Sequence, residues 1–563
     1  MIRNKYIYLV TAAMMIAGAA CKKQLNVGNP NQPTVADNVT TEAGLYAFTQ
    51  GATFTNGFVN GDGWLGDTYF SLVYGFQDLM GDAIGADVAN QQVDVISRPD
   101  LVTTETNFQV ANSSPQIGSL RSFNTRASSG AGNNPFYYQW LNMYALNNSC
   151  NLILTLVPTI SFSGDAASRA ATVNAWAYWW KGYAYAAIGT MYYSGLINDT
   201  ANVSNNNITN NHYLVHDSII ARSNYYFNLA ASTISAIGSS SDYTTVLGDL
   251  IPTAFQAGAN GGVPTQAQWL RNINSMLARN ILLNHLNPFV NGVVSSSIQK
   301  STITPMTSAD WQSVLSYASA GIQQSDPSFT GSSSTTNSVF SATGGNVSVN
   351  TTGPNSGTIF KISERLIQDF NTGDLRLPNN FNMADTFYDP NFTTRYSLNN
   401  GGDTAYTGVV ILGNKAAGAY QVYIASSWEE NTLMLAEAKI MTGSIDQGLL
   451  SVDSVRTYQG AKVAAVSGTT LTQAEAMTQL TRERRVALLF RGLSWYDARR
   501  WGWTYTIANG GGSYGNSYYD VNGNKYTNTT INYDFLDYWD VPADESVLNP
   551  AGSGSAATVN PNF

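Results

Sequence analysis

Two short patterns place residues at spacings that could support catalysis or metal binding. Gly511–Gly515 has the sequence Gly-Gly-Ser-Tyr-Gly, which fits the pattern around the nucleophile of a serine hydrolase. That motif needs a strand before it, a helix after it and a later histidine, whereas His212, His216 and His285 all precede it. His212 and His216 are four residues apart and could share a helix face, but the glutamate of a zinc-protease motif is missing. We therefore expect a glycine-rich turn at the first pattern and no metal at the second.

Acidic residues suggest two other kinds of chemistry. Asp520 begins a segment similar to a calcium-binding loop, but Lys525 and Ile531 stand where that loop needs a glycine and a terminal glutamate. Glycoside hydrolysis needs two carboxylates whose separation is defined only in space, so their spacing in the sequence does not exclude it. The carboxylates nearest to a predicted ligand loop are Asp62, Asp67, Asp78 and Asp82. We interpret them as capping, turn and hydrogen-bonding residues.

Aromatic residues in irregular segments favour binding without chemistry. A sugar ring offers apolar C–H faces and a rim of hydroxyls, which aromatic faces and polar side chains bind respectively. Trp64 lies in a glycine-rich stretch that Tyr69 follows, and Tyr388 and Tyr396 lie in a later irregular segment. We predict these four residues as ligand contacts, and we expect no catalytic residues, no metal and no cofactor.

The composition favours a large, weakly charged fold that is rich in aromatic residues. The chain has 563 residues, of which 12% are charged and 12% aromatic, with 32 tyrosines and 12 tryptophans. Its net charge is −9, and the sequence has no basic stripe. Because phosphate binding needs a basic surface, we expect no nucleic-acid partner.

The N-terminus is predicted to be a targeting segment followed by a tether. After a short basic start, residues 6–20 are apolar but too short to span a bilayer. The run ends Gly-Ala-Ala-Cys, so we predict a lipoprotein signal peptide at 1–20, lipidation of Cys21 and a polar tether at 21–40. Ordinary cleavage at an Ala-Gly-Ala site is the alternative. If Cys21 is acylated, Cys150 has no partner, and no disulfide is expected.

Apolar residues recur at helical spacing along most of the remaining chain, which predicts a mainly α fold of helix hairpins. Helices are expected from about residue 41, near 69–82, and over 136–156, 167–195, 213–237, 265–285, 308–322, 430–442 and 449–458. Between them, 325–357 is a polar loop of low complexity, and 381–423 is aromatic and loop-like. From 88 to 134 no regular pattern is visible. The tail at 505–540 is expected to form hairpins, with Asn522-Gly523 as a two-residue turn.

The stretch Glu483–Gly502 combines an apolar stripe with charges. Apolar residues from Val486 to Leu493 recur at helical spacing, and continuing that helix puts Asp497 and Arg500 in the same stripe. A charge on a buried face is costly unless it is paired. We therefore predict that Asp497 and Arg500 form a structural ion pair. The sequence leaves open whether Gly492 divides the segment into two helices.

The same stretch resembles the C-terminal signature of the SusD/RagB family. The residues that carry the resemblance are Glu483-Arg484-Arg485, Leu488, Phe490, Gly492, Trp495, Asp497 and Arg500-Trp501-Gly502. Leu433–Ala438, Asp374-Leu375-Arg376 and Trp539–Pro550 also resemble motifs of this family. Ala487 and Arg491 stand where glutamates are common, so the local ion pairs must differ from the family's usual network.

The resemblance implies an architecture and a function. The expected fold is mainly α and SusD-like, with tetratricopeptide-like helix pairs, long irregular loops and a few short hairpins in one domain over 41–563. Helices within 428–502 carry the family signature, and the N-terminal and middle loops form the ligand face. The family consists of lipoproteins anchored in the outer membrane and facing outward. They are non-enzymatic, capture oligosaccharides such as starch and deliver them to a SusC-like TonB-dependent transporter.

Two alternatives remain open. The RagB branch of the family implies a peptide or glycopeptide as the ligand within the same architecture. A polysaccharide hydrolase or lyase is the other alternative, and the missing catalytic motifs argue against it.

Overall fold

The protein is described by a computed structural model. It covers residues 39–54, 75–86, 98–112, 116–126, 134–201, 210–253, 256, 260–287, 289–290, 293–294, 298, 300–328, 330–332, 360–388, 394–399, 401–413, 421–520 and 522–563. The predicted signal peptide, Cys21, nearly all of the tether and most of the 325–357 loop lie outside the described residues.

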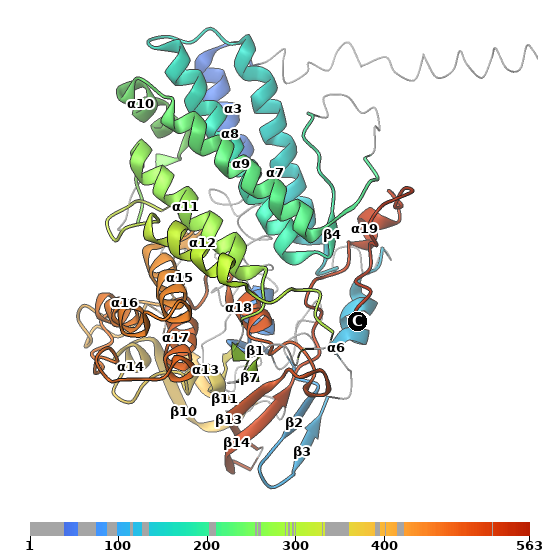
Figure 1. Cartoon of the computed structure of the whole chain (residues 1–563), viewed down its shortest axis with the longest axis vertical. Coiled ribbons are helices and arrows are strands. Elements are labelled where there is room, and N and C mark those ends of the chain that lie inside the picture. Colours follow the sequence, from blue (N-terminus) through green and yellow to red (C-terminus); the bar gives the residue numbers. More distant parts are fainter. Residues whose placement is uncertain are drawn as a thin grey trace, which may run out of the picture.

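Long helices form the upper part of the molecule in Figure 1. They are α3 (Glu42–Phe54), α7 (Tyr137–Leu156), α8 (Ala166–Met191), α9 (His216–Ser235), α10 (Ser240–Leu250), α11 (Gln266–Leu283) and α12 (Ser308–Ser319). Side-chain caps set where helices begin: Asp165 accepts from the backbone N–H of Ser168, and Thr265 forms reciprocal bonds with Gln268. The helices predicted from periodicity are present here, with shifted ends.

Tryptophans fill the space between α8 and its neighbours. Trp179 and Trp180 are fully buried, and their rings meet edge to face with 4.8 Å between centroids. Gly182 lets α9 approach closely, because a Cβ there would lie 2.8 Å from the ring of Phe227. Lys181 of α8 is also buried, and desolvation lowers its pKa although its ammonium lies 3.1 Å from the Asp199 carboxylate. This region is therefore held mainly by apolar packing.

A second group of helices lies below and carries the Glu483–Gly502 stretch. It consists of α15 (Trp428–Met441), α16 (Ile445–Tyr458), α17 (Gln473–Ala487) and α18 (Ser494–Arg500). The stretch is divided into two helices because Phe490 and Gly492 have φ angles of 61° and 69°. Left-handed residues of this kind cannot continue a right-handed helix. The question that the sequence left open at Gly492 is thereby answered.

The turn between α17 and α18 brings buried charges together. Asp497 accepts hydrogen bonds from Arg484 at 3.1 Å and from Arg500 at 2.7 Å. Arg500 also donates to Glu437 at 2.6 Å, and all four side chains are buried. Each charge therefore has a partner of opposite sign within hydrogen-bond distance, as a buried ionic group requires.

Other buried pairs extend this ionic packing. Glu483 accepts from Arg376 at 2.6 Å and from Arg456 at 2.9 Å. Arg491, which replaces a glutamate of the usual family pattern, donates to Glu429 at 2.9 Å. The departure from the pattern at 491 is thus matched by an acidic partner on α15.

Two four-stranded antiparallel sheets form the lower part of the molecule. The first has the order β1 (Ile84–Ala86), β9 (Phe360–Ile362), β11 (Thr394–Leu398) and β10 (Phe381–Tyr388). The second has the order β13 (Ser513–Tyr519), β14 (Lys525–Asn532), β2 (Leu101–Thr103) and β3 (Gln109–Ala111).

The sheets both confirm and correct the sequence-based predictions. The hairpin of β13 and β14 is present, with Asn522-Gly523 between its strands. The loop-like description of 381–423 is wrong at β10, β11 and β12 (Gln421–Tyr423), and the lack of regularity predicted over 88–134 is wrong at β2, β3 and α6 (Gln116–Phe123). These strands are short, and outside the hairpins β10–β11, β2–β3 and β13–β14 the pairings of the two sheets join segments that are separated in the sequence. Periodicity over a few residues does not reveal such partners.

The remaining elements are short connections. They are α4 (Gly75–Met80), α6 (Gln116–Phe123), α13 (Glu364–Ile367), α14 (Arg376–Asn380), α19 (Ala543–Ser546), η4 (Val157–Thr159), η7 (Ile507–Asn509), β4 (Ser194–Gly195) with β5 (Leu214–Val215), β6 (Phe289–Val290) with β7 (Val293–Val294), and β8 (Thr330–Ser332) with β12 (Gln421–Tyr423).

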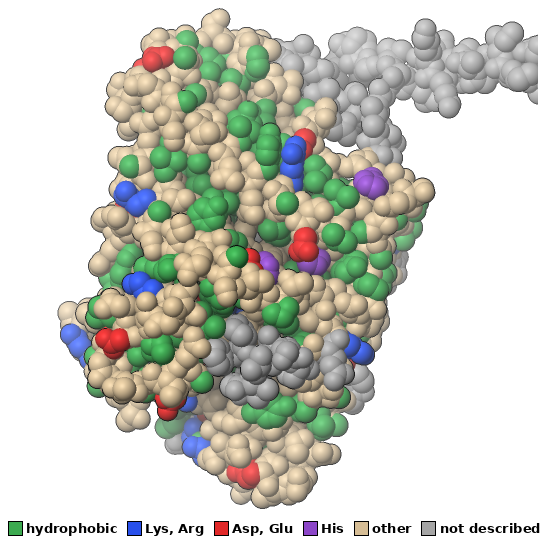
Figure 2. All heavy atoms as spheres, in the orientation of Figure 1, with side chains coloured by type: hydrophobic (Ala, Val, Ile, Leu, Met, Phe, Trp, Pro, Cys, Tyr) green, Lys and Arg blue, Asp and Glu red, His purple; other side chains and the backbone are tan. Residues whose placement is uncertain are grey.

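Charged side chains are few on the face of the molecule in Figure 2. On the face in Figure 2, blue and red side chains are scattered singly among neutral ones. Within the described ranges, no helix is both long and apolar enough to cross a membrane.

Candidate functional site

Tyr396 lies at the centre of a polar and aromatic surface on β11. Its neighbour Arg395 donates to Glu364 at 2.8 Å and to the hydroxyl of Tyr519 at 3.1 Å. The guanidinium also lies 4.4 Å from the ring of Tyr519 and 5.6 Å from the ring of Tyr396. We call Glu364, Arg395, Tyr396 and Tyr519 the Tyr396 surface.

The groups of the Tyr396 surface are fixed but not fully covered. Glu364 is buried, whereas the side chain of Arg395 is 21% exposed and both tyrosines are half-buried. The carboxylate holds the guanidinium in place, and the guanidinium in turn holds the rings. The surface can therefore offer aromatic faces and hydrogen-bonding groups to a ligand with little loss of side-chain freedom.

A cavity of about 300 Å³ opens on the other side of α13. It lies between α13, α17, the residues that follow α18, and β13, and we call it the α17 cavity. Trp503 and Tyr514 provide aromatic walls, and Gln368 and Asn516 provide amide groups. Because α13 and β13 contribute to both features, the Tyr396 surface and the α17 cavity adjoin the same two elements.

Buried ion pairs build the rear of the α17 cavity. Arg485 donates to Asp369 at 2.6 Å and to the backbone carbonyl oxygens of Gly81 and Asp82 at 2.7 and 2.9 Å. Arg365 forms two hydrogen bonds with the Asp82 carboxylate, at 2.7 and 2.9 Å. Burial opposes the ionisation of Asp82, but the charges of Arg365 and Arg485 outweigh it and hold its pKa below the usual value. For Asp369, burial dominates and raises the pKa despite Arg485.

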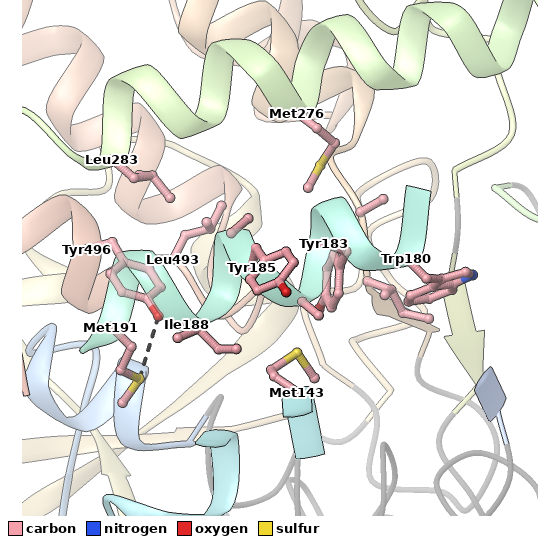
Figure 3. Packing of buried hydrophobic residues seen from close by; sticks show 14 of the residues in the cluster. Met143, Trp180, Tyr183, Tyr185, Ile188, Met191, Met276, Leu283, Leu493 and Tyr496 are labelled. Atoms are coloured by element: carbon pink, nitrogen blue, oxygen red, sulfur yellow. Dashed lines mark hydrogen bonds between the residues drawn. The ribbon is translucent and has the colours of Figure 1, made fainter. Parts of the chain in front are cut away.

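A smaller cavity, of about 60 Å³, lies between α8, α11 and α18. Figure 3 shows several of its lining residues, Tyr183, Met276, Leu283, Leu493 and Tyr496, packed among other apolar side chains. The hydroxyl of Tyr496 points to the sulfur of Met191 at 3.7 Å. A space of this size has room for a few water molecules only. We interpret it as part of the core.

The structure describes only some of the predicted ligand contacts. Trp64 and Tyr69 lie outside the described residues. Tyr388 and Tyr396 lie on neighbouring strands of one hairpin, where Tyr388 ends β10 opposite Thr394. The chain that leaves the segment of Trp64 and Tyr69 forms α4 and then β1, and β1 is separated from β11 by β9 alone. The strand β1, which follows α4, therefore belongs to the same sheet as the hairpin of Tyr396.

The other motifs considered from the sequence have structural explanations. Ser513 begins β13, and its hydroxyl lies 3.2 Å from the amide oxygen of Asn516. The ring of His216 stacks on Tyr538 with 3.9 Å between centroids. Burial raises the pKa of the Cys150 thiol to about 12, which makes it unreactive at neutral pH. Among the described residues, no group of three histidine, cysteine or acidic side chains is placed to hold a metal ion.

The carboxylates Asp78 and Asp82 are buried rather than exposed at a ligand loop. Asp78 accepts from the hydroxyl of Ser494 at 2.7 Å, and Asp82 binds Arg365. Both therefore have the hydrogen-bonding roles that the sequence suggested. Asp62 and Asp67 lie outside the described residues.

Sequence reasoning missed Arg395, Tyr519 and most of the α17 cavity. The one available signal was the pair Tyr518-Tyr519 shortly before Asn522-Gly523, since aromatic residues beside such a turn are typical of a hairpin strand. Nothing local shows that this strand lies beside α13 or that Arg395 meets Tyr519. Those contacts depend on sheet pairings between distant segments.

Comparisons with known proteins agree on the fold. The chain is 16% identical to a Bacteroides vulgatus protein named as a candidate sugar-binding protein, with a TM-score of 0.51 over 94% of this chain and 100% of that one. It is 14% identical to a protein solved with a xylogluco-oligosaccharide, with a TM-score of 0.50 over 91% and 98%. A SusD superfamily protein from Bacteroides vulgatus is 15% identical, with a TM-score of 0.44 over 81% and 87%. No match was found among curated proteins.

The sequence pattern of one family is found in the C-terminal part of the chain. Residues 430–551 match the model of the SusD family. This range begins in α15 and includes α16, α17, α18 and the hairpin of β13 and β14. This C-terminal part of the chain therefore carries the sequence pattern of the SusD family.

Proposed function

We propose that the protein binds oligosaccharides reversibly at the cell surface and passes them to a SusC-like TonB-dependent transporter. In this proposal, a lipid on Cys21 anchors the chain to the outer membrane, and residues 21–40 tether the folded body. The match of residues 430–551 to the SusD family model supports the proposal. So does the likeness in fold to a protein that was solved with a xylogluco-oligosaccharide.

The observation that carries the proposal is the pair of half-buried tyrosines around Arg395. Tyr396 and Tyr519 are partly exposed, and the Arg395 guanidinium, held by Glu364, lies 5.6 Å from the Tyr396 ring and 4.4 Å from the Tyr519 ring. Aromatic faces stack on the apolar side of a sugar ring, while fixed donors bind its hydroxyls. We propose Tyr396 as a direct contact. Trp64, Tyr69 and Tyr388 are proposed on their sequence context.

The ionic contacts around the site favour binding over hydrolysis. Glu364 is paired with Arg395, Asp369 with Arg485, and Asp82 with Arg365. A glycoside hydrolase needs one carboxylic acid that can donate a proton and a second carboxylate that is free to act on the sugar or on water. Arg395 and Arg365 bind both carboxylate oxygens of Glu364 and of Asp82, which leaves these two carboxylates poorly suited to act on a sugar or on water.

The test uses the chain without its first 21 residues. A glycan array followed by calorimetry is expected to find an oligosaccharide that binds, and Tyr396→Ala is expected to weaken that binding by about tenfold, because it removes a stacking face. The matched control is Tyr225→Ala. Tyr225 is 50% exposed on α9 and lies outside the Tyr396 surface.

Three results would contradict the proposal. Binding of peptides with no response to any glycan would establish the peptide alternative instead. Release of reducing sugar by the purified protein would establish an enzyme. Equal losses of affinity in Tyr396→Ala and Tyr225→Ala would remove Tyr396 from the site.

A further inference from the structure

The α17 cavity contains an excess of positive charge in a protein whose net charge is −9. Arg365, Arg482 and Arg485 line it, and Asp369 is the one carboxylate among its described lining residues. Arg485 forms an ion pair with Asp369, and Arg365 forms one with Asp82, which does not line the cavity. The positive charge of Arg482 is left over.

Arg482 differs from its neighbours on α17. Arg484 is bound by Asp497 and Arg485 by Asp369, and both side chains are buried. Arg482 lines the cavity, is partly exposed, and has no ion-pair partner within the described part of the chain. Its charge acts on Asp369, but that carboxylate is already bound to Arg485. A guanidinium in this setting is free to take an anionic ligand in two parallel hydrogen bonds.

The other walls of the cavity suit a sugar ring. Trp503 is half-buried and is held by the Arg485 guanidinium, which lies 4.8 Å from its ring. Tyr514 is 47% exposed at the mouth. Both present aromatic surface to a ligand, and Gly515 beside Tyr514 adds no side chain to the entrance.

Hydroxyl groups on α17 provide acceptors for sugar hydroxyls. Thr478 donates to the backbone carbonyl of Ala474 at 3.0 Å, and Thr481 donates to that of Met477 at 2.8 Å. Because each hydroxyl proton is committed to the helix, the oxygen lone pairs remain available as acceptors. Both residues line the cavity. The volume of about 300 Å³ is at the small end of ligand sites, which fits a single sugar residue.

We propose that the α17 cavity binds a carboxylated sugar residue of an oligosaccharide, such as a uronic or a sialic acid, with its carboxylate on Arg482 and its ring against Trp503 and Tyr514. The carboxylate balances the one unmatched charge of the cavity. A neutral sugar would leave the Arg482 guanidinium without a partner in a partly covered site. This inference rests on the proposed function, because it specifies the class of glycan that the protein captures.

The test compares acidic oligosaccharides with their own neutral derivatives. Oligosaccharides ending in galacturonic, glucuronic or sialic acid, each with its methyl ester, are titrated into the protein by calorimetry. The acid of at least one pair is expected to bind at least about tenfold more tightly than its ester, since the charge-assisted bonds to Arg482 are lost in the ester. Raising the salt concentration is expected to reduce this preference.

Two variants test whether the preference for the acid over its ester arises in the α17 cavity. Arg482→Gln is expected to abolish the preference for the acid, leaving the affinity for the ester and the melting temperature unchanged. Tyr514→Ser, at an exposed position, is expected to lower the affinity for the acid and for the ester by the same factor. The matched control is Arg126→Gln, because Arg126 is an exposed arginine that lies outside the cavity.

The outcomes separate this inference from the proposed function. If neutral glycans bind and no acid exceeds its ester, or if the preference survives in Arg482→Gln, the inference is wrong while the proposed function stands. If no glycan binds in either form, the proposed function is wrong and the inference with it.

Discussion

The upper helices and the lower helices are both closely packed, but the ion pairs in which both side chains are buried are concentrated, among the described residues, around the lower helices. Around α8, Trp176, Trp179 and Trp180 fill the interior with rings. Around α17 and α18, arginines and carboxylates are buried in pairs, with Asp497 shared by Arg484 and Arg500. Apolar packing accepts many combinations of side chains of suitable volume, whereas a bidentate ion pair accepts almost none.

This difference accounts for where the family is recognisable. The SusD family model matches residues 430–551, which contain the ionic helices. The likeness in fold, in contrast, extends over more than 90% of the chain, at identities of 14% to 16%. A shape that many apolar sequences can form leaves little sequence signature, and a network of specific charges leaves a clear one.

The largest effect is expected from breaking the ionic region. Arg500→Leu leaves Asp497 and Glu437 as buried charges with fewer partners, and we expect the free energy of unfolding to fall by about 3–5 kcal/mol. Chemical denaturation measures this free energy of unfolding. The control is Arg126→Gln, whose exposed pair with Asp544 spans 3.7 Å and whose loss should change stability by less than about 1 kcal/mol. A loss below 1 kcal/mol in Arg500→Leu would show that the network does not stabilise the fold.

The pH dependence is expected to distinguish a paired from an unpaired buried carboxylate. Burial raises the pKa of Asp78 to about 7, because Ser494 and the charge of Arg485 compensate only partly. Asp78 does not destabilise the fold below the pKa that it has in the unfolded chain, because it is protonated in both states. Between that pKa and about pH 7, the free energy of unfolding falls by about 1.4 kcal/mol per pH unit, because only the unfolded chain releases the proton. Asp78→Asn removes this loss, so its stability relative to the wild type should rise by about 3 kcal/mol between pH 4 and pH 7.

Asp497 should behave in the opposite way. Burial opposes its ionisation, but Arg484 and Arg500 outweigh burial and keep its pKa below the usual value. Its contribution is present above the unfolded pKa and is lost as the pH falls through the folded pKa. A relative stability of Asp78→Asn that does not change with pH would contradict the assignment of a raised pKa to Asp78.

Conservative exchanges should sharpen the comparison between the two regions. Arg500→Lys keeps the charge but cannot reach Asp497 and Glu437 together, and we expect a loss of about 2 kcal/mol. Met143→Leu, at a fully buried position of α7, should cost less than about 1.5 kcal/mol. Thermal and chemical unfolding of both variants measure the two losses in the free energy of unfolding. Equal losses would mean that the ionic region tolerates exchange as well as the apolar one.

The smallest effect is expected at the helix caps, where the two regions should not differ. Thr265 caps α11 and Thr472 caps α17 with the same reciprocal pattern. Replacing either by alanine should cost about 1 kcal/mol, because one N-terminal N–H loses its partner. Unequal losses would show that the difference between the regions extends to local helix signals.

Much of the helical framework was predictable because helical periodicity and capping are local. The pairing of Asp497 with Arg500 could be inferred because the two residues are three apart at helical spacing and a buried charge needs a partner, although the single helix that the apolar stripe predicted is broken at Phe490 and Gly492. The environment of Tyr396 could not be, since Arg395 meets Tyr519 only after β11 and β13 have been positioned by separate sheets. Arg482 is likewise indistinguishable from Arg484 and Arg485 in the sequence. Only their three-dimensional partners show which of the three arginines is unmatched.

The sheet of β13, β14, β2 and β3 also determines the order in which the molecule can assemble. Residue Asn532 of β14 pairs with Leu101 of β2, and Arg485 binds the carbonyl oxygen of Gly81, 404 residues earlier. The upper helices α7, α8 and α9 are neighbours in sequence and can associate as soon as they have been synthesised. The sheet of β13, β14, β2 and β3 must wait for the last part of the chain. Folding is therefore expected to proceed from the upper helices downward, and the Tyr396 surface and the α17 cavity, which both need β13, are completed last.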